Sequence, residues 1–252
     1  MVVKLTPADV MNDAPVIPVI VLSEVTHAVR LASALVEGGI RMLEVTLRTG
    51  AALACIEAIA NEVPEAVVGA GTVRNARDAQ AAAKAGARFA VSPGYTPAVG
   101  KACRDLELPL LPGVSTGSEI MAAQEDGFDA LKFFPAVAAG GVAMLRAWQG
   151  PFGDVKFCPT GGITPVNARD FLALPNVVCV GGSWLTPSEV IARLGSTPLS
   201  SSQRQASAFG CLNPSACGFV SESLGTRRLA FFQPCSSATI TAMSLPEVRI
   251  LT

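Results

Sequence analysis

A single lysine interrupts an otherwise apolar stretch of the sequence, FDALKFFPA at residues 128–136. An ammonium group that leaves water for an apolar interior loses much of its hydration energy, so a lysine there needs a partner or a way to lose its proton. Desolvation favours the neutral amine, which can attack a ketone to form an imine. Lys132 is therefore the first candidate for chemistry. Two structural alternatives stay open: its stem reaches water from a strand end, or a buried carboxylate neutralises it.

Polar and apolar residues alternate in LEVTLR, residues 43–48. Because successive side chains of a strand point to opposite faces, Glu44, Thr46 and Arg48 share one face. The three apolar residues between them form the other face, which suits packing against helices and turns the polar face toward the interior. An amine for a carbonyl, a carboxylate for proton transfer and a guanidinium for a carboxylate together suit a keto acid. The structural alternative is an ion pair between Glu44 and Arg48.

Two glycine pairs form a second constellation, in TGGI at 160–163 and GGS at 181–183. Glycine has no Cβ, so backbone N–H groups can approach the oxygens of a phosphate closely. In barrels of alternating strands and helices, the loops after the seventh and eighth strands commonly bind phosphate. The two pairs together predict a phosphate site, and the alternative for each pair is an ordinary turn.

These candidates must be positioned by regular elements. The intervening segments have a helical spacing of apolar residues, and most open with Thr, Ser or Asn, the preferred N-cap residues. Alternating strands and helices with short joints predict an α/β fold, a (β/α)8 or TIM barrel, with functional groups at the carboxyl ends of the strands. The segments rich in Val, Ile, Leu and Phe that we expect to be strands are 16–22, 42–48, 66–73, 89–94, 108–114, 130–136, 155–163 and 177–185.

The composition changes near residue 194. Residues 1–194 carry the barrel pattern, whereas residues 195–252 are rich in Ser and Cys and have no sustained helical or strand period. We expect an atypical tail that is poorly ordered or irregular, and a last helix that stops short.

Composition narrows the classes of function. The net charge of −1 gives no electrostatic footprint for nucleic acid, and no apolar run is long enough to cross a membrane. The only histidine, His27, makes a catalytic zinc site or a Ser-His-Asp site improbable. Seven cysteines without CxxC pairs and the absence of a signal peptide favour the cytoplasm. We expect small-molecule partners or copies of the same chain.

Taken in order and spacing, a set of motifs resembles the family of 2-keto-3-deoxy-6-phosphogluconate (KDPG) aldolase, also called 4-hydroxy-2-oxoglutarate (KHG) aldolase. The resemblance covers about residues 10–190. The motifs that carry it are LEVTLRT, VGAGTV, SPG, LPGVST, LKFFPA, FCPTGGI and GGSWL.

The resemblance implies a role for each matching position. Lys132 corresponds to the Schiff-base lysine and Glu44 to the acid/base that acts through a water. Arg48 and Thr72 correspond to ligands of the pyruvate carboxylate. The other implied site residues are Phe134 beside the lysine, and Gly161, Gly162, Gly182 and Ser183 at the phosphate.

The resemblance also implies the reaction and its setting. A metal-independent class I aldolase would cleave KDPG to pyruvate and D-glyceraldehyde 3-phosphate, and KHG to pyruvate and glyoxylate, as a homotrimer. The alternatives are a phosphogalactonate-type aldolase, a barrel decarboxylase or isomerase acting on another sugar phosphate, and an inactive barrel with a damaged carboxyl end. The sequence departs from the family at Val137, where many members have Glu, and in the tail from about Gly195.

Overall fold

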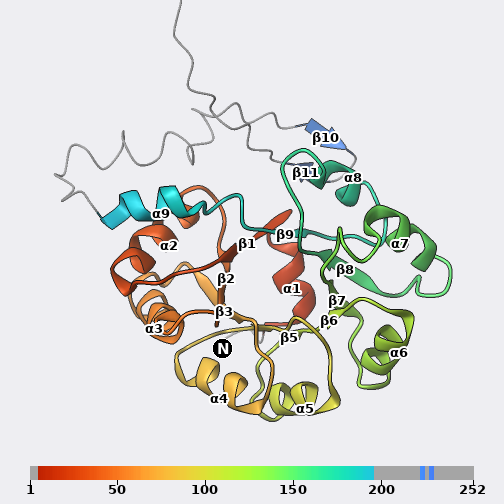
Figure 1. Ribbon diagram of the computed structural model, residues 1–252, viewed down its shortest axis with the longest axis horizontal. Helices are drawn as coiled ribbons and strands as arrows, with labels where there is room; N and C mark the ends of the chain where they lie inside the picture. Colours follow the sequence, from red (N-terminus) through yellow and green to blue (C-terminus); the bar gives the residue numbers. More distant parts are fainter. Residues whose placement is uncertain (1–4, 196–221, 225–226, 230–252) are drawn as a thin grey trace, which may run out of the picture.

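The computed structural model describes residues 5–195, 222–224 and 227–229 (Figure 1). The eight segments expected to be strands all contain one, and the segment at 108–114 contains two. The strands within residues 5–195 are β1 (Val16–Ile20), β2 (Met42–Thr46), β3 (Val67–Gly71), β4 (Ala90–Val91), β5 (Leu110–Leu111), β6 (Gly113–Val114), β7 (Ala130–Phe133), β8 (Lys156–Pro159) and β9 (Val180–Gly182).

The strands β1 to β9 pair in parallel. They form one sheet in the order β5-β4-β3-β2-β1-β9 and another in the order β6-β7-β8. Only Pro112 separates β5 from β6, and proline has no N–H to donate to a ladder. Near β8 and β9, single parallel bridges join Phe157 to Val177 and Thr160 to Gly181. Parallel strands joined through helices make this an α/β fold.

Helices lie around the outside of the strands, and α1 lies near the centre of the view (Figure 1). The N-caps agree with the sequence at Asn75 and Thr116, whose side chains accept hydrogen bonds from the third helical N–H. The helices are α1 (Pro7–Asn12), η1 (Val25–His27, a 3-10 helix), α2 (Ala28–Glu37), α3 (Ala52–Glu62), α4 (Ala76–Lys84), α5 (Pro97–Asp105), α6 (Gly117–Glu125), α7 (Gly141–Trp148), α8 (Ala168–Leu172) and α9 (Ser188–Gly195).

Helix α3 has no cap from Thr49, the residue that opens its helical pattern in the sequence. The N-cap of this helix is Ala51, which makes no side-chain hydrogen bond to the helix. The hydroxyl of Thr49 instead donates to the carbonyl of Leu22, at the end of the neighbouring strand segment. A threonine hydroxyl can form a hydrogen bond with any nearby backbone group. Here the hydroxyl of Thr49 makes a tertiary hydrogen bond, so it does not cap the helix.

The core has an outer part, between strands and helices, and an inner part enclosed by the strands. Leu43 and Val45 of β2 lie in the outer core, together with residues of α2 and α3. Met42, on the opposite parity, lies in the inner core with Val10 and Met11 of α1. The alternation expected for residues 43–48 is therefore confirmed, and the polar face of β2 is the inner one.

The expectation of an irregular tail falls largely outside the described residues. Within the tail, β10 (Glu222–Leu224) and β11 (Arg227–Leu229) pair antiparallel. Helix α9 runs through the point where the composition changes. In the described part of the chain, no helix has the length and apolar character needed to cross a membrane.

Candidate active site

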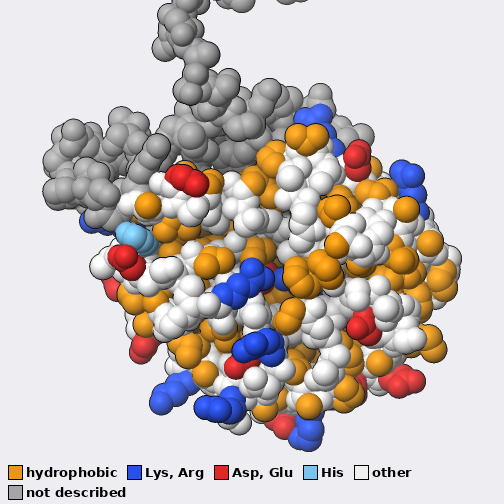
Figure 2. Space-filling model, in the orientation of Figure 1, with side chains coloured by type: hydrophobic (Ala, Val, Ile, Leu, Met, Phe, Trp, Pro, Cys, Tyr) orange, Lys and Arg blue, Asp and Glu red, His pale blue; other side chains and the backbone are white. Residues whose placement is uncertain are grey.

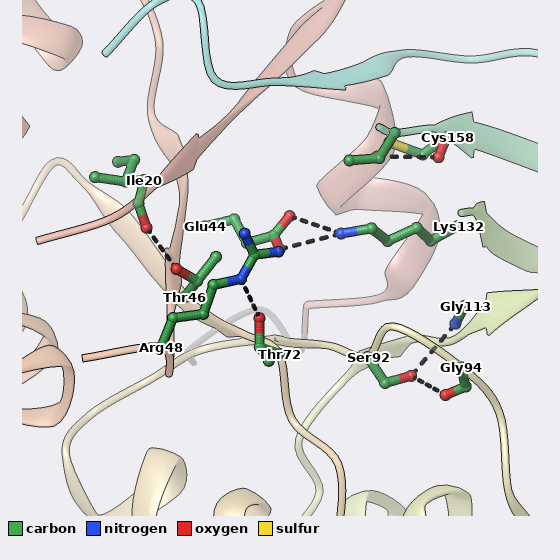
Figure 3. A network of polar contacts seen from close by, with 11 residues as sticks. Ile20, Glu44, Thr46, Arg48, Thr72, Ser92, Gly94, Gly113, Lys132 and Cys158 are labelled. Carbon is green, nitrogen blue, oxygen red and sulfur yellow. Dashed lines mark hydrogen bonds and ion pairs between the residues drawn. The ribbon is translucent and has the colours of Figure 1, made fainter. Parts of the chain in front are cut away.

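The buried lysine meets a buried carboxylate. Lys132 on β7 and Glu44 on β2 both point inward, and the Nζ of Lys132 lies 3.2 Å from Oε1 and 3.5 Å from Oε2 of Glu44 (Figure 3). Their side chains are only 5% and 4% exposed. Because β2 and β7 belong to different sheets, this contact crosses the interior. One of the two structural alternatives for Lys132 was a buried carboxylate that neutralises it. Glu44 is such a carboxylate, and it is also the residue predicted to be the acid/base.

The interior has space for this pair because a glycine faces Glu44. A Cβ on Gly71 would lie 2.3 Å from Oε1 of Glu44, much closer than any real contact. Gly71 pairs with Thr46 on the adjacent strand, so its missing side chain opens room beside the carboxylate. Gly71, the second glycine of GAGT, thus has a packing role at the site in addition to ending β3.

Arg48 lies just beyond the end of β2 and is turned toward the end of β3. Its Nε donates to the hydroxyl of Thr72 at 3.2 Å. The structural alternative paired Arg48 with Glu44, but the ion pair of Glu44 is with Lys132. The guanidinium and the hydroxyl come from neighbouring strand ends and face the same interior as the amine (Figure 3). They can bind a carboxylate beside it.

Thr72 has an unusual backbone. Its φ is 63°, in the left-handed region that is costly for a β-branched residue. Hydrogen bonds hold both sides: the N–H of Leu47 donates to the carbonyl of Gly71, and the N–H of Val73 donates to the carbonyl of Val91. Such strain occurs most often at functional sites. Residue types and spacing alone did not indicate a role for Thr72. That prediction came only from the resemblance to the family.

Phe134 follows Lys132 by two residues and lies beside its amine. The Nζ of Lys132 is 5.4 Å from the centre of the Phe134 ring, within the range of a cation–π contact. The ring is half-buried. It therefore forms an apolar wall of the site beside the amine.

The glycine loops lie at the same end of the strands. Gly161 and Gly162 follow β8 with φ of 99° and 77°, which residues with a side chain rarely adopt. The bridge between Thr160 and Gly181 brings this loop next to the end of β9, where Gly182 and Ser183 lie. A Cβ on Gly161 would lie 3.3 Å from the ring of Phe134. The structure thus joins the glycine pairs to each other and, through Phe134, to Lys132.

The side chains at the surface of this face include several cations (Figure 2). Arg48 is exposed, as is Ser183, whereas Glu44 and Lys132 are not. Among the described residues, no three His, Cys, Asp or Glu side chains are grouped so that they could hold a metal ion. The arrangement is a buried amine and carboxylate beneath an exposed guanidinium, beside two glycine loops.

Comparison with known proteins decides the family. The sequence model described as "Aldolase: KDPG and KHG aldolase" matches residues 8–196. The chain belongs to this family. The KHG/KDPG aldolase of Escherichia coli K12 is 53% identical over 188 residues, which cover 75% of this chain and 88% of the relative. Membership of the KDPG and KHG aldolase family makes the protein a carbon–carbon lyase.

Solved structures agree. A KDPG aldolase from Legionella pneumophila, with pyruvate captured as a covalent carbinolamine intermediate, is 48% identical with a TM-score of 0.74. The match covers 76% of this chain and 94% of that one. The KDPG aldolase of Zymomonas mobilis with 3-phosphoglycerate is 44% identical with a TM-score of 0.71, over 75% of this chain and 93% of that one. The resemblance read from the motifs of this KDPG and KHG aldolase is confirmed.

Proposed function

We propose that this protein is a class I aldolase that cleaves KDPG to pyruvate and D-glyceraldehyde 3-phosphate through an imine on Lys132. The same chemistry cleaves KHG to pyruvate and glyoxylate. The observation that carries the proposal is the buried contact between the Lys132 amine and the Glu44 carboxylate at 3.2 Å, beside the Arg48–Thr72 pair. The carbinolamine in the Legionella relative supports a covalent route from amine to ketone.

The first step needs a neutral amine, and the contact places Glu44 where it can take the proton of Lys132. Transfer of one proton from the Lys132 ammonium to the Glu44 carboxylate leaves an amine and a carboxylic acid, with no net change of charge in the interior. The amine attacks C2 of the keto acid to give a carbinolamine. Glu44, now a carboxylic acid, gives its proton to the C2 hydroxyl, and water leaves to form the protonated imine, which is the electron sink of the reaction. Glu44 is then a carboxylate again.

Carbon–carbon cleavage then needs a base. Glu44, acting through a water, removes the proton of the C4 hydroxyl as the C3–C4 bond breaks, and the electron pair of that bond passes into the imine. The aldehyde leaves, and the enamine that remains takes a proton at C3. Water adds to the resulting pyruvate imine, and pyruvate is released with the free amine of Lys132.

The other site residues bind the two ends of the substrate. Arg48 and Thr72 hold the carboxylate next to C2, and the ring of Phe134 packs beside the imine. Gly161, Gly162, Gly182 and Ser183 hold the phosphate at the far end. The support is their placement: the two glycine loops meet at the Thr160–Gly181 bridge, beside the site.

We infer three broader features on the same basis. The two sheets close into a (β/α)8 barrel, which is supported by the short Pro112 break between β5 and β6 and by the bridges near β8 and β9. The protein works in the cytoplasm as a homotrimer, as its resemblance to the family implies. The chemistry of an imine requires neither a metal nor another cofactor.

One experiment tests the reaction. The protein is incubated with pyruvate and borohydride in the presence of EDTA, and the modified residue is located by mass spectrometry. We expect a reduced adduct on Lys132, and none in Lys132→Ala. A folded wild-type protein without an adduct would contradict the imine mechanism and favour a sugar-phosphate decarboxylase or isomerase, or an inactive barrel.

A further inference from the structure

A single peptide group connects the backbone of Lys132 to a buried serine. The carbonyl of Pro112 accepts a hydrogen bond from the N–H of Lys132 at 2.8 Å. The N–H of the same peptide group belongs to Gly113, and it donates to the Oγ of Ser92 at 3.3 Å. Gly113 is also the residue in register with Lys132 across β6 and β7.

Ser92 lies at the break between the two sheets. Its backbone N–H donates to the carbonyl of Leu111, the last residue of β5. Beyond that point Pro112 interrupts the ladder, and the hydroxyl of Ser92 takes the place of a backbone acceptor for Gly113. A side chain therefore makes the hydrogen bond that links the sheet of Glu44 to the sheet of Lys132 at this point.

The serine hydroxyl is fixed in orientation. It is 1% exposed, and it donates to the carbonyl of Gly94 at 2.7 Å, which leaves a lone pair for the N–H of Gly113 (Figure 3). Two hydrogen bonds in sequence polarise each other and strengthen both. Without the hydroxyl, the N–H of Gly113 would lose this partner in a buried setting, which is costly.

Nothing separates the segment of Ser92 from Gly113. A Cβ on Gly113 would lie 2.5 Å from the carbonyl carbon of Pro93 and 2.7 Å from the carbonyl oxygen of Ser92. The two backbones are thus in direct contact. A shift at Ser92 reaches the peptide group of Gly113 without a side chain to absorb it.

We propose that Ser92 is a positioning residue for Lys132. Its hydroxyl holds the Pro112–Gly113 peptide group, which holds the backbone of Lys132 and so sets the amine against Glu44. The proposal rests on the proposed role of Lys132 as the Schiff-base residue. Misplacement of a reacting group by about 1 Å can lower a rate by about 100-fold, so a small relaxation of this peptide group slows imine formation.

The test separates positioning from binding and from stability. Ser92→Ala removes the acceptor, and Ser92→Cys keeps the size of the side chain but replaces the hydroxyl with a weak acceptor. We expect both to lower kcat for KDPG by about tenfold or more, with KM within about twofold because Arg48 and the glycine loops are unchanged. At saturating pyruvate and with borohydride present, the adduct on Lys132 forms correspondingly more slowly.

Thr96→Ala is the matched control. Thr96 lies four residues after Ser92. Its hydroxyl caps α5 and accepts a hydrogen bond from the N–H of Val99 at 3.3 Å. Its loss lowers the melting temperature without touching the Pro112–Gly113 peptide group, so we expect wild-type kcat and adduct rate. If Ser92→Ala does not fold, Ser92→Cys decides the question.

The outcomes are distinct. Unchanged kcat and adduct rate in the folded serine variants would overturn the proposal, as would a loss that appears only in KM or equally in Thr96→Ala. An absent adduct in the wild-type protein is a different result, because it contradicts the imine on Lys132 itself.

Discussion

Glu44 and Lys132 are 88 positions apart in the chain, yet the Nζ of Lys132 lies 3.2 Å from Oε1 of Glu44 in the interior. Neither side chain has much access to water. The contact accounts for the burial of both groups, since each charge compensates the other. It also places the Glu44 carboxyl, which can accept and donate a proton, beside the amine that would form the imine.

Glu44→Gln tests the role of this carboxylate. The amide keeps the shape of the side chain but cannot take a proton, so we expect kcat for KDPG cleavage to fall by about 100-fold to 10,000-fold. Steady-state kinetics with coupled detection of pyruvate measures the change. Prolonged incubation with pyruvate and borohydride should still label Lys132, because the amine remains. A kcat within tenfold of the wild type would show that another group transfers the proton.

Gly71→Ala tests the space beside Glu44. The added methyl group would lie 2.3 Å from Oε1 and 2.7 Å from Cγ of Glu44, so the carboxylate must leave its present position beside Lys132. We expect a loss of kcat comparable to that of Glu44→Gln and a stability loss of about 1–3 kcal/mol from overpacking. Chemical denaturation and kinetics measure both effects. Gly150→Ala is the control, because a Cβ there meets nothing within 4 Å; equal activity in the two variants would contradict the expectation.

Val137→Glu tests the phosphate loop. The Val137 N–H donates to the carbonyl of Gly161 at 3.1 Å, and a Cβ on Gly162 would lie 2.8 Å from that of Val137. The Val137 side chain is half exposed at this loop, and many family members carry Glu here, so a carboxylate in its place is compatible with a bound phosphate. We expect KM for KDPG in Val137→Glu to stay within about twofold of that in Val137→Gln, because solvent screens an exposed charge.

The unphosphorylated substrate supplies the comparison for Val137. Cleavage of 2-keto-3-deoxygluconate should likewise differ little between Val137→Glu and Val137→Gln. A rise in KM for KDPG alone would contradict the expectation and show that the carboxylate repels the phosphate.

Glu119→Gln tests the pH dependence of stability. Burial raises the pKa of Glu119, but hydrogen bonds from Ser115 and Thr116 outweigh it and hold the pKa below the ordinary value of 4.5. Its Oε2 accepts from the backbone N–H of Ser115 at 2.7 Å and of Thr116 at 2.9 Å, in the capping box of α6. Because the folded-state pKa is depressed, the carboxylate stabilises the fold above pH 4.5, and the contribution is lost as the pH falls through the folded-state value.

The wild type should therefore exceed Glu119→Gln in unfolding free energy by about 1 kcal/mol at pH 7. The difference should close in acid, as urea denaturation at several pH values would show. A difference independent of pH would assign the effect to packing.

The sequence by itself determined the strands and the inner face of β2. A strand repeats every two residues, so the apolar parity of LEVTLR was enough to turn Glu44 inward. The motifs were specific enough to indicate the family, and with it the residues that we propose bind pyruvate and phosphate.

Only the tertiary structure decided which groups meet. Glu44 could pair with Arg48 or with Lys132, and local spacing favours neither, because the choice depends on two strands that do not pair. The positive φ of Thr72 and the approach of Glu44 to Gly71 are likewise features of the folded chain alone. The link from Ser92 to Lys132 passes through a peptide group, which has no signature in the order of side chains.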